Sequence, residues 1–274
     1  MPNAKTIAAT CLTLFSLNAA AAQEPLWELG VGLSALSLPD YRGSSTTQDY
    51  LLPYPHIIYR GDFLEIDRDN IKGRLFTSDR IDLDISVAAA PPVNSDNNDA
   101  RDGMDDLNPA AEIGPSLEIL LFGSKEDSGF FLKLPVRKVI ATDLSDFTDA
   151  GWTFSPYLQY KDKHFFGDWT FSASLGPMYA TARYHDYYYG VDPVDAAAGR
   201  PAYSATDGYS GSRVTLTLDK RIGRDYWVGA FMRYDDLSGA SFEDSPLVEQ
   251  DHSLMAGIAF TWFFAHSSTM VERN

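Results

Sequence analysis

Alternation of apolar and polar residues over segments of about ten residues is the feature that most constrains this fold. In residues 27–35 one face carries apolar side chains from Trp27 to Ala35, and the other carries Glu28, two glycines and Ser34. The same period of two recurs at 80–89, 152–161, 213–219 and 254–264. After residue 22 there is no run of 18 apolar residues, and the mean hydropathy is −0.21, so a bundle of transmembrane helices is excluded.

A soluble β-sandwich alternates in the same way, but three features favour a transmembrane β-barrel. The segments reach the length of roughly ten residues that a tilted strand needs to cross a bilayer, whereas strands of soluble sheets average about five or six. Their polar faces hold Gly, Ser, Thr and mixed charges, which suits a lumen. Aromatic residues gather at the predicted strand ends, where interfacial girdles lie: Trp27, Trp152, Tyr160, Trp169, Tyr184, Tyr226, Tyr234 and Trp262.

The lengths of the connections support this interpretation. Long links follow the odd strands and short links follow the even ones, as an outer-membrane barrel with external loops and periplasmic turns requires. The short link at 67–71 breaks this rule, so ten strands is the alternative to twelve. The twelve predicted strands are 27–37, 50–60, 62–67, 71–76, 80–90, 111–122, 130–141, 151–161, 167–185, 212–220, 225–236 and 252–264.

Residues 1–22 have the pattern of a secretory signal peptide. Lys5 precedes a mostly apolar run, and a stretch of alanines ends at Ala22, after which we expect cleavage. The single cysteine, Cys11, lies in this segment, so the mature chain has no disulfide. It keeps 21 basic residues against 38 acidic ones, which argues against non-specific nucleic-acid binding. We expect a barrel over 23–264 and a periplasmic tail over 265–274, whose polar composition suggests a frayed end.

Two short segments resemble signatures of the MipA/OmpV family of Gram-negative outer-membrane proteins. The first runs from Leu38 to Ser44 and continues in Pro53-Tyr54-Pro55, and the second covers 239–248. The resemblance implies an outer-membrane barrel that contacts lipid and lipopolysaccharide. It also implies a scaffold that links a lytic transglycosylase to a penicillin-binding protein, although other members are described as adhesins or porin-like proteins. The candidate motif residues are Pro39, Asp40, Tyr41, Gly43, Ser44, Gly239, Phe242, Asp244, Ser245 and Pro246.

The first motif has the composition of a turn. Pro39 fixes φ, Asp40 can accept backbone hydrogen bonds, and Gly43 allows a positive φ. A loop folded over the barrel rim explains these residues more simply than a binding loop does.

Catalytic, metal and cofactor motifs are not evident in the sequence. None of the five histidines stands in a metal-binding pair, and no glycine-rich phosphate loop occurs, so we predict no metal and no cofactor. Asp251-His252-Ser253 is the one adjacent trio of hydrolase type, but neighbours on a strand point to opposite faces. An outer-membrane hydrolase is therefore the third choice of function.

Charge is distributed unevenly. Acidic residues crowd the 91–110 and 235–251 connections, whereas the predicted turns are basic and are candidate periplasmic partner contacts, through Lys161, Lys163, Lys220, Arg221 and Arg224. Solvated loops explain the same pattern equally well. Inward charges are predicted at Glu28, Asp82, Asp84, Glu112, Glu118, Lys133, Arg137, Lys161 and Arg213.

Our interpretation is a non-catalytic outer-membrane barrel that acts as a scaffold in cell-wall synthesis. The alternatives are a narrow channel, which the acidic excess would make cation-preferring, or an adhesin-like surface protein. Tyrosines 184 and 187–189 suggest an interfacial belt more than a sugar-stacking patch.

Overall fold

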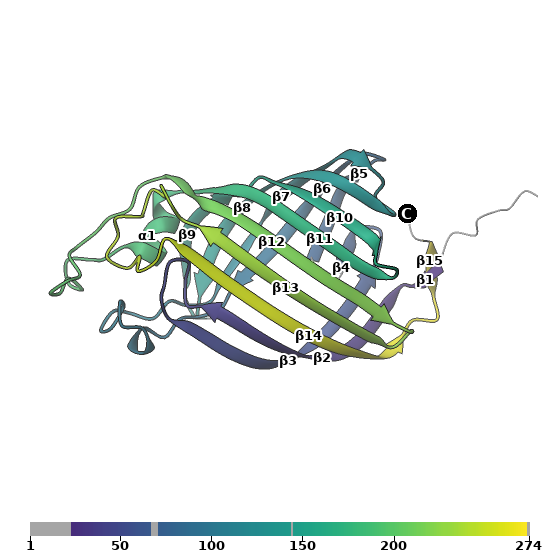
Figure 1. The fold of residues 1–274 in the computed structure, drawn as a ribbon, viewed down its shortest axis with the longest axis horizontal. Coiled ribbons are helices and arrows are strands. Elements are labelled where there is room, and N and C mark those ends of the chain that lie inside the picture. The colour runs from purple at the N-terminus through teal and green to yellow at the C-terminus, as the bar shows by residue number, and fades with distance from the viewer. Residues whose placement is uncertain (1–22, 67–70, 144, 273–274) are drawn as a thin grey trace, which may run out of the picture.

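The computed structural model describes residues 23–66, 71–143 and 145–272, so the predicted signal peptide lies outside the described residues. The chain forms a long antiparallel β-barrel with one short helix near one end (Figure 1). The barrel strands are β2 (Trp27–Pro39), β3 (Thr47–Arg60), β4 (Leu64–Ile66), β5 (Ile71–Thr77), β6 (Ile81–Ala90), β7 (Ala110–Gly123), β8 (Ser128–Thr142), β9 (Phe147–Phe154), β10 (Tyr157–Phe165), β11 (Trp169–Ala180), β12 (Gly208–Ile222), β13 (Tyr226–Asp236) and β14 (His252–His266). Four further elements are not part of the barrel sheet: β1 (Gln23–Pro25), β15 (Met270–Glu272), helix α1 (Ala182–Tyr189) and a 3-10 turn (Ser95–Asn97).

The barrel closes through pairing of the last long strand with the first. β14 and β2 pair antiparallel from Ala256 opposite Ser37 to His266 opposite Glu28. β9 and β10 act as one strand interrupted at Ser155 and Pro156, because both pair with β8 and with β11. Within the described residues this gives a closed twelve-stranded barrel, with β4 and β5 both present, so the ten-strand alternative is wrong.

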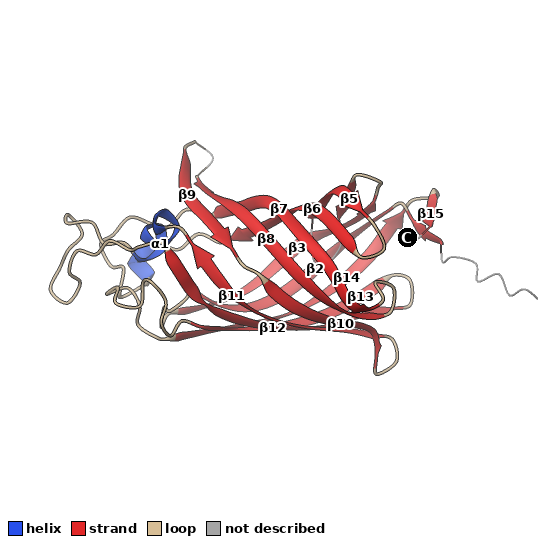
Figure 2. Cartoon of the chain, turned by 90° about the horizontal axis from the view of Figure 1, so that it is seen from above, coloured by secondary structure: helices blue, strands red, loops and turns tan. Residues whose placement is uncertain are grey.

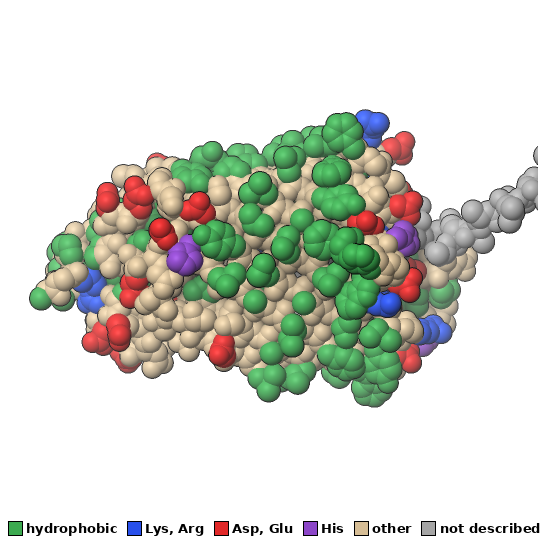
Figure 3. Space-filling view, in the orientation of Figure 1, with side chains coloured by type: hydrophobic (Ala, Val, Ile, Leu, Met, Phe, Trp, Pro, Cys, Tyr) green, Lys and Arg blue, Asp and Glu red, His purple; other side chains and the backbone are tan. Residues whose placement is uncertain are grey.

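The alternation in sequence becomes an apolar outer surface. Val31 and Leu33 of β2 and Ile258 and Phe260 of β14 are about half exposed, and their neighbours face the lumen. Apolar side chains cover much of the wall in Figure 3. Exposed apolar area of this extent is costly in water and matches a bilayer. No helix in the described part of the chain is long and apolar enough to span a membrane.

The two ends of the barrel differ in the way that the connection lengths predict. Long connections gather at one end, which we call the loop end, and short links gather at the other, which we call the turn end (Figures 1 and 2). The loop end carries 91–109, 181–207 and 237–251, whereas the turn end carries links such as 223–225.

The structure corrects the predicted end of one strand and the prediction for the tail. The predicted strand 167–185 ends at Ala180, and Thr181 precedes helix α1. Tyr184 is therefore a buried residue of a helix and not part of an interfacial girdle. The tail also differs from a frayed end: β14 continues to His266, and β15 pairs with β1, so both ends of the described chain form a two-stranded ribbon at the turn end.

Candidate functional site: the capped lumen

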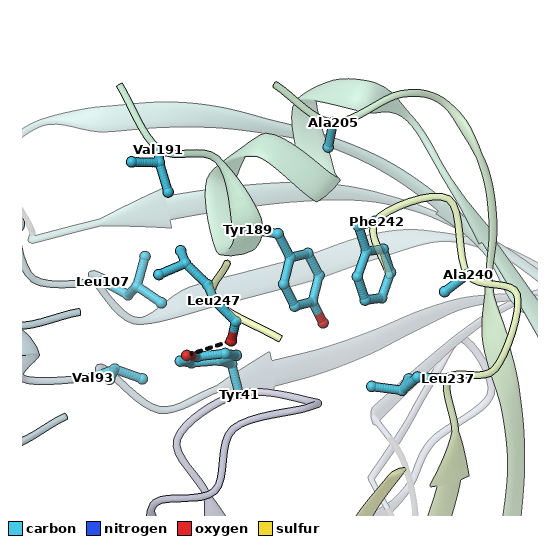
Figure 4. Packing of buried hydrophobic residues seen from close by; sticks show 10 residues of the cluster. All are labelled: Tyr41, Val93, Leu107, Tyr189, Val191, Ala205, Leu237, Ala240, Phe242 and Leu247. Atoms are coloured by element: carbon cyan, nitrogen blue, oxygen red, sulfur yellow. Dashed lines mark hydrogen bonds between the residues drawn. The ribbon is translucent and has the colours of Figure 1, made fainter. Parts of the chain in front are cut away.

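The long connections pack together at the loop end and form a small hydrophobic core. We call the segments 40–46, 91–109, 181–207 and 237–251 the cap. Phe242 and Leu247 are completely buried, and Leu237 and Tyr189 are almost so. Figure 4 shows these side chains converging from connections that are far apart in sequence. The buried members are Tyr41, Val93, Leu107, Tyr189, Val191, Ala205, Leu237, Ala240, Phe242 and Leu247.

The two signature motifs meet in this cap, although about 200 residues separate them. The Tyr41 hydroxyl donates to the Leu247 carbonyl at 2.8 Å (Figure 4). The Gly43 carbonyl accepts from the backbone N–H groups of Glu249 and Gln250 at 2.8 and 3.0 Å. The Gly43 N–H donates to Ser253 Oγ at 2.7 Å. The first motif is therefore a loop fixed over the rim, as its turn composition predicts.

Gly43 is required by this close approach. Its φ is +89°, and a Cβ at this position would meet Leu237 Cδ1 at 3.0 Å and the Gln250 carbonyl oxygen at 3.2 Å. Any other residue would combine an unfavourable backbone conformation with crowding against the 237–251 connection.

The second motif contributes the centre of the cap core. Phe242 stacks on Tyr189 with ring centroids 3.7 Å apart and planes 6° apart. Ser245 Oγ donates to the Tyr189 carbonyl at 2.7 Å. Gly239 adopts a positive φ of +73°, whereas Asp244 is exposed and Pro246 half-buried at the surface. On the side of the first motif, Asn98 Nδ2 donates to Asp40 Oδ2 and Ser44 Oγ, and Pro39 ends β2.

Helix α1 packs at the barrel mouth, where Tyr184 is buried against residues of β7, β8, β9 and β11. Burial raises the pKa of Tyr184 to about 12, so its hydroxyl stays protonated and the side chain is uncharged at neutral pH. Tyr187 donates to the Asn108 carbonyl at 2.8 Å and Tyr189 to the Arg42 carbonyl at 3.0 Å. The tyrosines are thus built into the cap, and the predicted interfacial belt at this position is wrong.

His185 is the buried histidine of the cap. Its Nδ1 lies 2.6 Å from the Thr206 carbonyl oxygen, and its Nε2 lies 3.1 Å from Ser210 Oγ. Burial lowers the pKa of His185, so the ring is neutral at pH 7. Since His185 and Ser210 are both completely buried, this pair cannot meet a substrate without cap opening.

A cavity of about 780 Å³ occupies the lumen below the cap. It extends from Arg42, Tyr184 and Tyr188 under the cap to Asp62 and Val271 at the turn end. Its described lining includes six acidic residues and ten basic ones. The net charge of the lining is therefore positive, whereas the net charge of the whole chain is negative. The basic residues are Arg42, Arg60, Arg74, Lys125, Lys133, Arg137, Lys161, Lys163, Arg213 and Arg233.

Most predicted inward charges form ion pairs between strands. Lys133 Nζ lies 2.7 Å from Glu118 Oε2, and the two residues are direct partners in the β7–β8 register. Arg137 Nη1 lies 3.6 Å from Glu112 Oε2. Further pairs join Lys125 to Asp82 and Arg60 to Glu28. Asp84 is buried on β6, and Lys161 lines the cavity.

An arginine cluster lies under the cap, and of its members only Arg213 is among the predicted inward charges. Arg213 Nε donates to Asp235 Oδ1 at 2.8 Å, and Arg42 Nε lies 3.7 Å from the same oxygen. Arg233 follows on β13, facing the lumen two residues before Asp235. Strict alternation from Trp227 would have placed Arg233 and Asp235 inside, but Asp235 was grouped with the acidic outer connection. With its side chain only 2 % exposed, Asp235 belongs to the lumen.

The predicted basic turn residues lie in different environments. Arg224 is exposed in the β12–β13 turn. Lys220 lies over the Trp169 ring at 5.8 Å. Arg221 pairs with Glu28 and lies 4.0 Å from the Phe263 ring centre, so it is part of the barrel interior. Lys161 and Lys163 line the cavity rather than projecting from a turn.

The adjacent trio does not form a hydrolase site. His252 is half exposed, pairs with Asp251 at 2.8 Å and stacks on Tyr234, whereas Ser253 is buried on the opposite face. Within the described ranges, no three metal-ligating side chains converge.

The chain is similar to one protein family, to a named outer membrane protein and to solved structures. The family described as MltA-interacting protein MipA matches residues 31–264. The Escherichia coli K12 protein YiaT, which is named as an outer membrane protein, is 25% identical over 243 residues, covering 86% of this chain and 91% of its own. An outer membrane channel from Pseudomonas putida F1 covers 90% of this chain and 98% of its own at 11% identity, with a TM-score of 0.44. OprG of Pseudomonas aeruginosa, also 11% identical, covers 89% of this chain and 98% of its own with a TM-score of 0.25.

Proposed function

Because the chain belongs to the MipA family and forms a β-barrel of the outer membrane, we propose that it is a non-catalytic scaffold for murein enzymes. The partners we propose are a lytic transglycosylase and a penicillin-binding protein, and the family description as MltA-interacting protein supports the first. The turn end would face the periplasm, as short turns do in outer-membrane barrels.

The observation that carries the proposal is the closed loop end. A wide pore needs both mouths open, but here buried side chains of four connections pack across one mouth. Phe242 and Leu247 have no exposed surface, so the cap is a packed core and not a loose set of loops. This arrangement supports a structural or binding role over free diffusion through the lumen.

The turn end offers features that suit a protein partner. The β1–β15 ribbon stands outside the barrel wall, and each of its strands has a single partner. Unpaired backbone groups on such a ribbon can accept a further strand. Arg224 is an exposed positive charge in the β12–β13 turn at the same end of the barrel. A surface that presents a strand edge fits a partner with an extended segment.

A narrow channel is the second candidate, and the 780 Å³ lumen cavity favours it. The excess of basic residues in its lining supports anion preference for such a channel, in place of the cation preference expected from the acidic excess of the whole chain. It would also require the cap to open.

Site-specific photo-cross-linking in cells tests the scaffold. A cross-linking amino acid at Arg224 or Val271 should capture a murein enzyme, identified by mass spectrometry. The same amino acid at Arg183, which is 64% exposed at the loop end, is the matched control. Equal capture from both ends, or no murein enzyme from the turn end, would contradict the proposal.

A charge-reversal experiment separates the basic turn from the ribbon. Arg224→Glu should weaken capture from Val271 if the turn charge contributes, and Arg183→Glu should leave capture unchanged. Planar-bilayer conductance of the purified barrel tests the channel: a steady open pore in the intact protein would favour the second candidate.

A further inference from the structure

The arginine cluster beneath the cap contains more positive charge than the protein neutralises. Arg42, Arg213 and Arg233 approach one carboxylate, that of Asp235, and Arg213 and Arg42 both use its Oδ1. The charged groups that act most strongly on Arg233 are Arg213, Asp235, Arg42 and Glu112. Glu112 itself lies 3.6 Å from Arg137. Four guanidinium groups therefore share two carboxylates.

Burial makes this imbalance significant. The Arg42 side chain is 11% exposed and that of Asp235 is 2% exposed. Like charges that are removed from bulk water repel each other strongly, and buried charges in folded proteins are normally paired. A further negative group next to Arg233 would therefore stabilise the cluster.

Hydrogen-bond donors in the cluster are also unused. Arg42 Nε and Arg233 Nε are buried and have no hydrogen-bond partner in the protein. The other Arg42 nitrogens donate to the Ser210 carbonyl and to Met178 Sδ, which holds this guanidinium in place. Asp235 Oδ2 has no partner either, so the carboxylate does not satisfy Arg233.

The cluster is accessible from the lumen. Arg42, Arg213 and Arg233 all line the cavity, together with Tyr184 and Tyr188, and the same cavity reaches Asp62 and Val271 at the turn end. The cap covers the opposite side. A small ligand can therefore reach the arginines only along the lumen while the cap is closed.

We infer that the cap end of the lumen is a binding site for a small ligand that carries an oxyanion, either a carboxylate or a phosphate. Guanidinium groups suit both, because their N–H donors match two oxygens at once. Tyr184 and Tyr188 form a wall on which the remainder of the ligand, such as a sugar ring, would pack. The site does not depend on the proposed scaffold function.

Titration calorimetry on the full mature barrel in detergent, at low ionic strength, tests this inference. Inorganic phosphate and N-acetylmuramic acid are the two probes, and they separate a phosphate ligand from a sugar carboxylate. Arg233→Met should weaken binding of the preferred probe at least tenfold. Arg74→Met is the matched control: Arg74 lines the same cavity but is paired with Glu65 at 2.6 Å, so affinity should change less than twofold.

A second variant, for which we expect tighter binding, distinguishes a direct effect on the site from loss of folding. Asp235→Asn keeps the shape of the side chain but removes the competing carboxylate, so oxyanion affinity should rise several-fold. Damage to the fold would lower affinity instead. The inference is overturned if neither probe binds the intact protein, if Arg233→Met binds as tightly, or if Asp235→Asn binds more weakly while the barrel retains its heat-modifiable mobility on gels.

Discussion

Replacing Phe242 by alanine should loosen the cap without affecting the barrel wall. Phe242 is completely buried and makes the closest ring contact of the cap, with Tyr189 at 3.7 Å. It joins the second signature motif to helix α1, so its loss removes the packing that holds two connections together.

The expected size follows from the burial. Truncation of a fully buried phenylalanine to alanine costs about 3–5 kcal/mol, since apolar contact is lost and a cavity remains. Each 1.4 kcal/mol changes an equilibrium tenfold. If the closed cap bears the whole cost, the open fraction rises by a factor between roughly 10² and 4 × 10³.

Cleavage by a glutamate-specific protease reports this opening. Glu243 and Glu249 lie within 237–251, and hydrogen bonds hold both carboxylates in the closed cap: Glu243 accepts from the Gly239 N–H, and Glu249 accepts from Ser45. Cleavage of a transiently open segment follows its equilibrium population when reclosing is fast. Mass spectrometry of fragments cut after these two residues gives the rate on the purified barrel.

Phe260→Ala is the matched control. Phe260 is 47% exposed on the lipid face of β14, so its loss should leave cleavage in 237–251 close to wild type. The cap interpretation is refuted if Phe242→Ala is cut no faster than Phe260→Ala.

Three further predictions concern the cap and the termini. Gly43→Ala should speed the same cleavage more than Gly103→Ala, because both positions have positive φ but the Gly103 Cβ would meet nothing within 4 Å; equal rates would show that crowding is unimportant. Because burial lowers the pKa of His185, the open cap binds a proton more readily below about pH 6.5, so opening should increase as pH falls from there. His185→Gln should make cap opening less dependent on pH. An NMR titration in which the His185 imidazole shows an ordinary histidine pKa would contradict the prediction. Deleting 270–274 should leave heat-modifiable mobility unchanged, because barrel closure ends at Glu28 and His266; loss of the folded band would contradict this.

The barrel was predictable because its signal is local. Side chains alternate across a strand, so the lipid face of β14 can be read from Leu254 to Phe264 without knowledge of any partner strand. Closure, strand length and the difference between loops and turns follow from the same pattern. The predicted strand 167–185 is too long because the alternating pattern continues beyond the end of β11 into helix α1.

The charged cluster was only partly predictable. Alternation of side chains along β12 predicts that Arg213 faces the lumen. The same alternation along β13 predicts that Arg233 and Asp235 face the lumen as well. Arg42 gave no such signal, because it lies in a loop whose direction is set by contacts from Tyr189 and the 237–251 connection. The residues of a loop show no periodicity, so the sequence does not indicate which side chains point into the lumen.

A membrane-spanning barrel with unequal ends can be predicted from the sequence, since alternation and connection length are encoded residue by residue. The closure of the lumen by the long connections, which brings Arg42 to Arg213 and Asp235, could not be predicted in this way. That outcome depends on packing between segments about 200 residues apart, such as Tyr41 against Leu247. Contacts of this kind have no local pattern, because they form only after the barrel has fixed where each loop begins and ends.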